Sequence, residues 1–276
     1  MVASPFLFCL NKAIAQISAV VREKIKGNIP KGRVIYIDSK SSDPLFMNYE
    51  SFDDIYHRAC QRKGGEAALE SLLLEPLSHA QLASISDDRF LAQFTKSIFQ
   101  SGFVWRVIHN KWPSFEEVFW DFNIEKLLLM PTDMLERKAQ DTRIVRNFTK
   151  VKTIPANAQM IRNVQREHGS FAKFIANWPE DDIINLWLYL KKHGERLGGN
   201  TGPYALRQMG KDTFILTGDI ESYLRAQSII EGGLYSKRSL LAIQRAFNHW
   251  QAESDRTLTE ISRVIAYGVG ENIVQA

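Results

Sequence analysis

Residues 190–205 read LKKHGERLGGNTGPYA, and this stretch decides the fold. It ends a strongly amphipathic segment that begins near Asp182, and three of its glycines fall within five residues, namely Gly198, Gly199 and Gly202. Glycine allows positive φ angles and lets the backbone approach another surface with no side chain in between. We therefore predict a tight turn between two helices near residues 182–210.

Two interpretations of this turn remain open. A helix that begins where the turn ends would point free N–H groups outward, which makes an anion site suited to a DNA phosphate and is a helix-hairpin-helix. The same glycines would also suit a plain connection between helices that binds nothing. A nucleotide P-loop is excluded because no Gly-Lys-Ser/Thr follows the glycines. The candidates for phosphate contact are Gly199, Asn200, Thr201, Gly202, Lys191, Lys192 and Arg146.

Asp219 lies nine residues after Gly210, in the sequence TGDIESYL over 217–224. At the start of a helix it would be a good N-cap, which is a structural role. A carboxylate beside a phosphate-binding hairpin could also face the sugar of a bound nucleotide. The two roles are compatible, and both stay open.

Helix signals repeat along the chain and strand patterns are nearly absent, which predicts an all-α fold of short helices in two lobes around a cleft. Ser51 with Asp54 opens a segment that ends at Gly64-Gly65, and a second short helix should run to Glu75. No repeat of fixed period is visible, so a helical solenoid is excluded. Further helix starts are expected at Ser86, at Ser114 with Glu117, at Thr132, after Pro155, at Pro179 to Asp182, and at Thr257 with Glu260.

Residues 1–46 are expected to be an N-terminal extension of a helical domain at 47–276. They contain a turn-rich break, the strand-like run Val34 to Ile37 and a polar linker. The apolar run from Pro5 to Val21 is interrupted by polar residues and has no basic segment ahead of it. It therefore indicates neither a signal peptide nor a membrane span.

Composition indicates an ordinary globular protein of 276 residues and 45% hydrophobic content. Its two cysteines, Cys9 and Cys60, offer no disulfide framework and no metal-binding cluster, so a reducing cytoplasm is expected. Residues 136–212 hold 14 Lys and Arg against 8 Asp and Glu, a local charge of +6 in a chain of net charge +4. This basic segment would suit phosphate contact, although Lys and Arg also simply solvate helices.

Several motifs occur in the order found in the bacterial 3-methyladenine DNA glycosylase I family, which the chain resembles between about Phe52 and Leu224. That family belongs to the wider helix-hairpin-helix glycosylase superfamily. The matching motifs are Tyr56-His57, Gln100 to Trp105, Asp141 to Asn147 with Lys150 and Lys152, Leu190 to Gly194, and Gly199 to Thr201 with Tyr204.

The resemblance implies a DNA repair glycosylase that flips an alkylated purine out of the duplex and hydrolyses its bond to deoxyribose. In the superfamily an aspartate just beyond the hairpin is the catalytic carboxylate, and Asp219 occupies that place. Trp105 and Tyr56 are then the candidates to hold the electron-poor base by cation–π contact, with His57 and Ser97 beside them in the pocket. The remaining tryptophans are expected to pack in the core.

The chain departs from the family pattern at two points. The family ties its termini together with a Cys/His zinc site, of which only His57 survives here, with Ile220 and Leu224 near the later ligand positions. The family also places a glutamate in its base pocket where this chain has Ser97, which bears on recognition of 3-methyladenine in particular. We therefore expect no metal and no cofactor, in a cytoplasmic monomer that acts on damaged double-stranded DNA and binds no membrane.

Two other functions remain open. A protein of the same fold could bind damaged DNA without cutting it. An all-α scaffold with no DNA partner would leave the glycine hairpin and the local charge of +6 unexplained.

Overall fold

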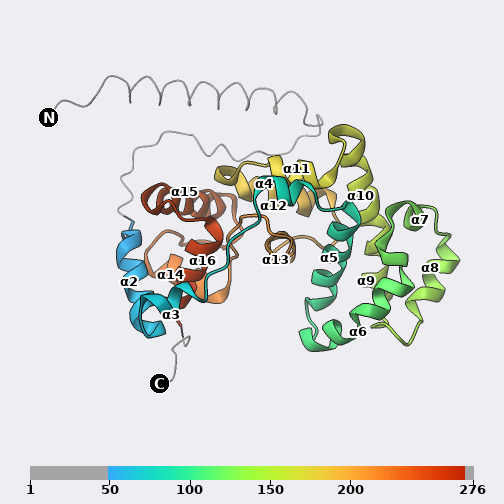
Figure 1. Cartoon of the computed structure of the whole chain (residues 1–276), viewed down its shortest axis with the longest axis horizontal. Coiled ribbons are helices and arrows are strands. Elements are labelled where there is room, and N and C mark those ends of the chain that lie inside the picture. The colour runs from blue at the N-terminus through green and yellow to red at the C-terminus, as the bar shows by residue number, and fades with distance from the viewer. Residues whose placement is uncertain (1–48, 271–276) are drawn as a thin grey trace. The chain divides into compact units, whose positions relative to one another are not determined.

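The computed structural model describes residues 49–270, which belong to the larger of the chain's two units, residues 36–276. All regular secondary structure in the described residues is helical (Figure 1). The prediction of an all-α fold is confirmed. The expected extension at 1–46, with its strand-like run Val34 to Ile37, lies outside the described residues.

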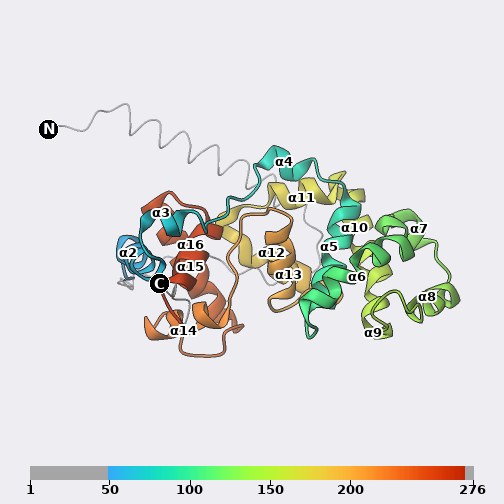
Figure 2. The same ribbon diagram turned by 60° about the horizontal axis from the view of Figure 1, so that its bottom comes forward.

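Helices from both ends of the described chain pack together, and we call this group the terminal lobe (Figures 1 and 2). Helix α2 contacts α3, α15 and α16, and α14 packs against α16. The members of this lobe are α2 (Phe52–Lys63), α3 (Glu66–Glu70), α14 (Gly218–Ala226), α15 (Lys237–Ser254) and α16 (Leu258–Tyr267).

The intervening helices form a central lobe, in which α5 packs against α13 and α10 contacts α5, α7 and α11. Helix α12 also contacts α15, so it joins the two lobes. The members are α4 (His79–Ala83), α5 (Asp87–Gln100), α6 (Trp105–Val118), η1 (Trp120–Phe122), α7 (Ile124–Leu128), α8 (Thr132–Ala139), α9 (Phe148–Val151), α10 (Thr153–His168), α11 (Phe171–Asn177), η2 (Glu180–Asp182), α12 (Ile183–His193) and α13 (Thr201–Gln208).

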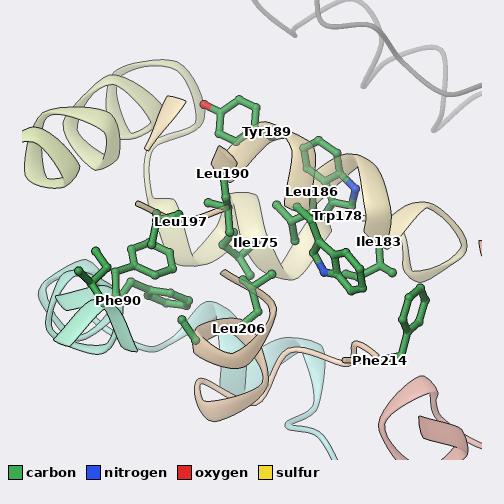
Figure 3. Close-up of a cluster of buried hydrophobic side chains, with 14 of the residues drawn as sticks. Phe90, Ile175, Trp178, Ile183, Leu186, Tyr189, Leu190, Leu197, Leu206 and Phe214 are labelled. Carbon is green, nitrogen blue, oxygen red and sulfur yellow. The ribbon is translucent and has the colours of Figure 1, made fainter. Parts of the chain in front are cut away.

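The predicted pair of helices joined by a tight turn near residues 182–210 is present as α12 and α13, and it sits on a buried apolar cluster (Figure 3). Leu190, Leu197 and Leu206 come from the two helices and the turn between them, and all three are almost fully buried. Ile175 of α11 and Phe90 of α5 complete the cluster. Burial of these side chains fixes both helices, and with them the turn, to the central lobe.

Several predicted helix ends are confirmed by their caps. The Ser51 side chain accepts a hydrogen bond from Asp54 N at the start of α2, and Gly64 ends that helix with a φ of 86°. Thr257 and Glu260 form the expected capping box of α16. The two ends of α2 and the start of α16 are therefore determined by neighbouring residues in the sequence.

Two other predicted ends are wrong. Ser114 lies inside α6, which begins at Trp105, because Ile108, Phe115 and Val118 form one buried face that carries the helix past residue 114. Helix α3 ends at Glu70, short of the predicted Glu75. In α6, burial of the apolar face outweighs the local start signal.

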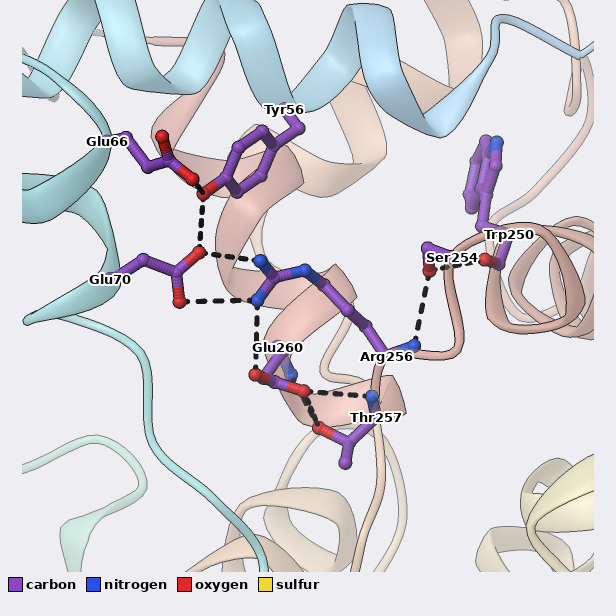
Figure 4. A network of polar contacts seen from close by, with 8 residues as sticks. All are labelled: Tyr56, Glu66, Glu70, Trp250, Ser254, Arg256, Thr257 and Glu260. Atoms are coloured by element: carbon purple, nitrogen blue, oxygen red, sulfur yellow. Dashed lines mark hydrogen bonds and ion pairs between the residues drawn. The ribbon is translucent and has the colours of Figure 1, made fainter.

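Polar networks hold α2 and α3 to the C-terminal helices (Figure 4). Arg256 donates to Glu70 at 2.6 Å and to Glu260 at 3.3 Å, and the Tyr56 hydroxyl donates to Glu70 at 2.5 Å. The hydrogen bond from Arg256 is the main reason that the pKa of Glu70 is lowered. In a second network, Glu50 accepts hydrogen bonds from Arg58 and from the Tyr223 hydroxyl of α14.

Tryptophan packing agrees with the sequence. Trp178, Trp187 and Trp250 are buried, and Trp112 and Trp120 are partly buried against the core. The prediction that these five residues pack in the interior is confirmed.

Candidate DNA interface and active site

The hairpin at residues 194–200 closes because glycines stand at its points of closest approach. A Cβ on Gly194 would lie 2.6 Å from Leu197 Cδ1, and a Cβ on Gly202 would lie 2.6 Å from the carbonyl oxygen of Leu197. Gly199 differs, since it has a φ of +59° and open space around its Cβ position. Gly194 and Gly202 thus serve packing, while Gly199 presents bare backbone at the surface.

A buried asparagine of α10 braces the hairpin from beneath. The Asn157 amide nitrogen donates to Glu195 O at 3.1 Å, and its Oδ1 accepts from Glu195 N at 2.8 Å. Asn157 is fully buried, so both polar groups need these partners. Sequence reasoning missed this residue. The signal was an amide on the same helical face as the apolar Ile154, Ala158 and Ile161.

Helix α13 starts at the hairpin, where Thr201 N donates to Gly198 O at 3.3 Å and Pro203 has no N–H to offer. No side chain of the described part caps α13. Lys191, Lys192 and Arg196 are exposed around the turn. Exposed backbone at Gly199 with positive charge around it would suit contact with a phosphate.

Asn200 does not point outward as a phosphate ligand would. Its amide nitrogen donates to the carbonyl oxygen of Leu216 at 2.7 Å, beneath the turn. Of the other predicted phosphate contacts, Thr201 is half-buried, Gly202 is buried in the packed turn, and Arg146 is exposed just before α9.

The turn between α5 and α6 lies against the same hairpin. The rings of Trp105 and Tyr204 meet edge to face, with their centroids 5.8 Å apart. Phe103, Val104, Trp105 and Val107 are all exposed, Val104 to 66% and Trp105 to 51%. Exposed apolar side chains beside a basic hairpin make this surface a candidate for contact with a partner.

Lys150 holds this turn in place from α9. Its Nζ donates to Phe99 O at 3.2 Å and to Ser101 O at 2.5 Å, and it lies 4.6 Å from the centre of the Phe103 ring. Burial, and then the charge of Arg196, lower the pKa of Lys150. A lysine is suited to this place because it neutralises the carbonyl end of α5.

Asp219 lies in the first turn of α14, but it is not the N-cap. Thr217 caps the helix by accepting from Ile220 N, so the predicted cap role of Asp219 is wrong. The chain that follows α16 reaches this carboxylate, since a Cβ placed on Gly270 would lie 2.5 Å from Asp219 Oδ1. Arg62 of α2 donates to the carbonyl oxygen of the same Gly270.

The segment 211–217 carries the chain from α13 to Asp219, and α16 holds it. Thr259 Oγ1 accepts from Thr213 N at 3.4 Å, and Ser262 Oγ accepts from Ile215 N at 3.3 Å. Arg207 donates two hydrogen bonds to Thr213 O. The position of Asp219 is therefore set by α13 on one side and by α16 on the other.

The four predicted base-pocket residues lie on α2, α5 and α6, and each has partners of its own. Tyr56 donates to Glu70 within the terminal lobe, and the exposed His57 donates from Nδ1 to Asp53 O of its own helix. Trp105 packs against Tyr204 in the central lobe, and Ser97 is buried on α5 with Gln93 as its partner. One shared base pocket therefore stays a prediction, and the networks of Figure 4 hold α2, which carries Tyr56 and His57, to α3 and α16.

A cavity of about 370 Å³ lies elsewhere, and none of the predicted site residues lines it. Burial raises the pKa of Glu180 in its wall, where the Lys211 ammonium already donates to Trp178 O at 2.6 Å. The lining residues are Leu77, His79, Leu82, Ala176, Asn177, Trp178, Pro179, Glu180, Lys211 and Asp212.

The residues do not fit the zinc site that the resemblance implies. Within residues 49–270, no group of three or more His, Cys, Asp or Glu side chains could hold a metal ion. Ile220 and Leu224 are buried apolar residues, while the polar networks join α2 to the C-terminal helices instead. Cys9 lies outside the described residues.

We predict that the purified protein carries no stoichiometric zinc, because a structural site needs four nitrogen or sulfur ligands. Elemental analysis after extensive dialysis measures this directly. One zinc per chain, lost together with thermal stability in a chelator, would show that ligands have been missed.

Comparison with known proteins agrees with the resemblance. Residues 82–213 match the family model described as Methyladenine glycosylase, in line with the family that the motifs resemble. This match spans α5 to α13, including the hairpin. Among the described residues, no helix is long and apolar enough to cross a membrane.

Two solved structures illustrate the similarity. The 3-methyladenine DNA glycosylase I from Staphylococcus aureus is 21% identical with a TM-score of 0.42, over 55% of this chain and 91% of its own. The Methanocaldococcus jannaschii 8-oxoguanine glycosylase/lyase, solved with a 15mer DNA containing 8-oxoguanine, is 15% identical with a TM-score of 0.47, over 78% and 96%.

Proposed function

We propose that this chain, which carries the methyladenine glycosylase segment at residues 82–213, is a DNA repair glycosylase that excises alkylated purines. The family match supports the enzyme class. The proposed site rests mainly on the hydrogen bond from Asn200 to the carbonyl oxygen of Leu216. This bond joins the basic hairpin, where no side chain caps α13, to the segment that leads to Asp219. We further propose that the protein acts as a monomer in the cytoplasm.

The hairpin would bind the phosphate backbone. Gly199 lets a phosphate approach the exposed main chain of the turn, whose backbone N–H groups would then donate to it. Lys191, Lys192 and Arg196 would add charge that acts on any sequence. This contact fixes the register of the strand without reading its bases.

The exposed apolar side chains of Phe103 and Val104, which precede α6, would enter the duplex next to the bound phosphate. Apolar side chains inserted at a base step unstack it, at a cost of a few kcal/mol, and a damaged base leaves the stack most easily. Val104 is the most exposed of these residues and best placed to enter. The open face of Trp105 would then hold a cationic purine.

Asp219 would serve the chemical step. An alkylated purine carries positive charge, so it departs readily with the electron pair of the N-glycosidic bond. Positive charge then develops on the sugar, and a fixed carboxylate stabilises it and orients the water that adds to C1′. The proton of that water passes to solvent or to the carboxylate, which leaves an abasic sugar and a free base.

An excision assay over a panel of lesions tests this function. Duplexes that contain one methylated or deaminated base are incubated with excess protein, and alkali-labile abasic sites are counted over time. We expect abasic sites from methylated purines. Tight binding of a damaged duplex without any abasic product would identify a damage-binding protein instead. The absence of salt-dependent duplex binding would refute a DNA partner altogether.

Lys191→Ala should weaken binding to every duplex about equally, because Lys191 is exposed beside the turn and its charge acts on phosphate. The slope of log Kd against log salt should fall by about one. Fluorescence anisotropy between low and moderate salt measures both quantities. Lys173→Ala is the matched control, an exposed lysine on α11 outside the hairpin. Equal slopes for the two variants would contradict phosphate binding at the hairpin.

A further inference from the structure

The side chain of Asn200 is used in an unexpected way. Asparagine at the start of a helix commonly caps it, yet Asn200 stands at the N-cap of α13 and makes no capping hydrogen bond. Its amide nitrogen reaches across to the carbonyl oxygen of Leu216 at 2.7 Å. Its Oδ1 is buried and finds no donor within residues 49–270. A buried acceptor without a donor costs free energy, and a capping hydrogen bond from Oδ1 to the backbone of α13 would have avoided that cost. The side chain is directed toward Leu216 instead.

The partner of Asn200 stands three residues before Asp219, and the backbone between them is tightly bonded. Thr217 N donates to Ile215 O at 3.0 Å, and Glu221 N donates to Thr217 O at 2.9 Å. The Thr217 side chain caps α14. A displacement of Leu216 is therefore passed to the first turn of α14 and to Asp219.

The other side of Asn200 is the hairpin itself. Tyr204 N donates to Asn200 O at 2.9 Å, and Asn200 directly follows Gly199, the exposed residue with positive φ. The residue thus touches the phosphate-binding turn through its backbone and the Asp219 segment through its side chain.

We propose that Asn200 is a positioning residue, which fixes the Asp219 carboxylate relative to the DNA phosphate held by the hairpin. This role rests on the proposed function. It replaces the phosphate contact that the sequence predicted for this side chain. Binding of the DNA backbone at the hairpin and excision at Asp219 are then coupled through the side-chain amide of Asn200.

The test is a double-mutant cycle of Asn200→Ala and Asp219→Asn, measured as single-turnover excision rates with saturating protein. Asn200→Ala should lower the rate by about 10- to 100-fold, the loss expected when a reacting group is misplaced by about 1 Å. The Kd for a duplex with an abasic-site analogue should stay near the wild-type value. In the Asp219→Asn background, Asn200→Ala should cause little further loss, because it acts through Asp219.

Asn123→Ala is the matched control, since Asn123 caps α7 through Lys126 N and lies outside the hairpin. It should change the melting temperature but not the rate. Three results would overturn the role: a weaker Kd with an unchanged rate, no change in either, or an equal loss of rate in the Asp219→Asn background. A wild-type protein that excises no lesion would refute the proposed function itself, and the role would fall with it.

Discussion

Asp219→Asn should abolish most excision while the protein stays folded. The substitution keeps the shape of the side chain but removes the charge that would stabilise the sugar cation. Loss of one well-placed electrostatic group costs about 10²- to 10³-fold in rate, and a base that leaves readily needs less help, so the lower figure is expected. Since Thr217 is the cap of α14, the helix start does not depend on Asp219. Single-turnover excision and the melting temperature are measured together.

Glu221→Gln is the matched control for this prediction. Glu221 stands in the same first turn of α14 and pairs with Arg225 at 2.7 Å. Its loss should leave the excision rate near that of the wild type. Full activity of Asp219→Asn, or an equal loss in the two variants, would return Asp219 to a structural role.

Gly199→Val should lower the affinity for every duplex by about tenfold or more. A branched side chain is strained at a φ of +59°, and it would fill the open space through which a phosphate approaches the backbone. Anisotropy titrations with damaged and undamaged duplexes measure the loss, which should be equal for both.

Gly169→Val separates strain from contact. Gly169 ends α10 with a φ of +79° and also has open space around its Cβ position, so the backbone strain is similar. Both variants should lose thermal stability to a similar degree, but only Gly199→Val should lose affinity. If the two lose affinity alike, the hairpin is not the phosphate site.

The hairpin could be predicted because its signal is local. Glycines at 194, 198, 199 and 202 stand where the turn needs close approach or a positive φ, and the flanking residues are amphipathic. The same holds for α2 and α16, whose caps use neighbours in sequence. Turns and caps of this kind depend on a few adjacent residues, so a short stretch of sequence is enough to predict them.

The residue that caps α14 could not be predicted from the local sequence. Thr217 and Asp219 are both good capping residues, and local sequence does not rank them. The structure selects Thr217, because α13 and α16 hold the preceding segment in a register that starts the helix at Gly218. The choice between Thr217 and Asp219 as the N-cap of α14 therefore depends on contacts with residues distant in the sequence.

The placement of α2, which carries Tyr56 and His57, could not be predicted for the same reason. Tyr56 precedes its partner residue Arg256 by 200 positions, and Glu50 precedes Tyr223 by 173. These contacts place α2 in the terminal lobe, while the paired Trp105 and Tyr204 belong to α6 and α13 of the central lobe. Motif order along the chain carries no information on this placement.

The most direct test of the account is the identity of the product released from a methylated duplex. Wild-type protein in excess is incubated with DNA that carries methylated purines, and the small-molecule fraction is separated by chromatography. We predict free methylated purine in the soluble fraction and an equal amount of abasic sites in the duplex. Retention of every methylated base in the DNA, under conditions where the protein is shown to be bound, would contradict a glycosylase.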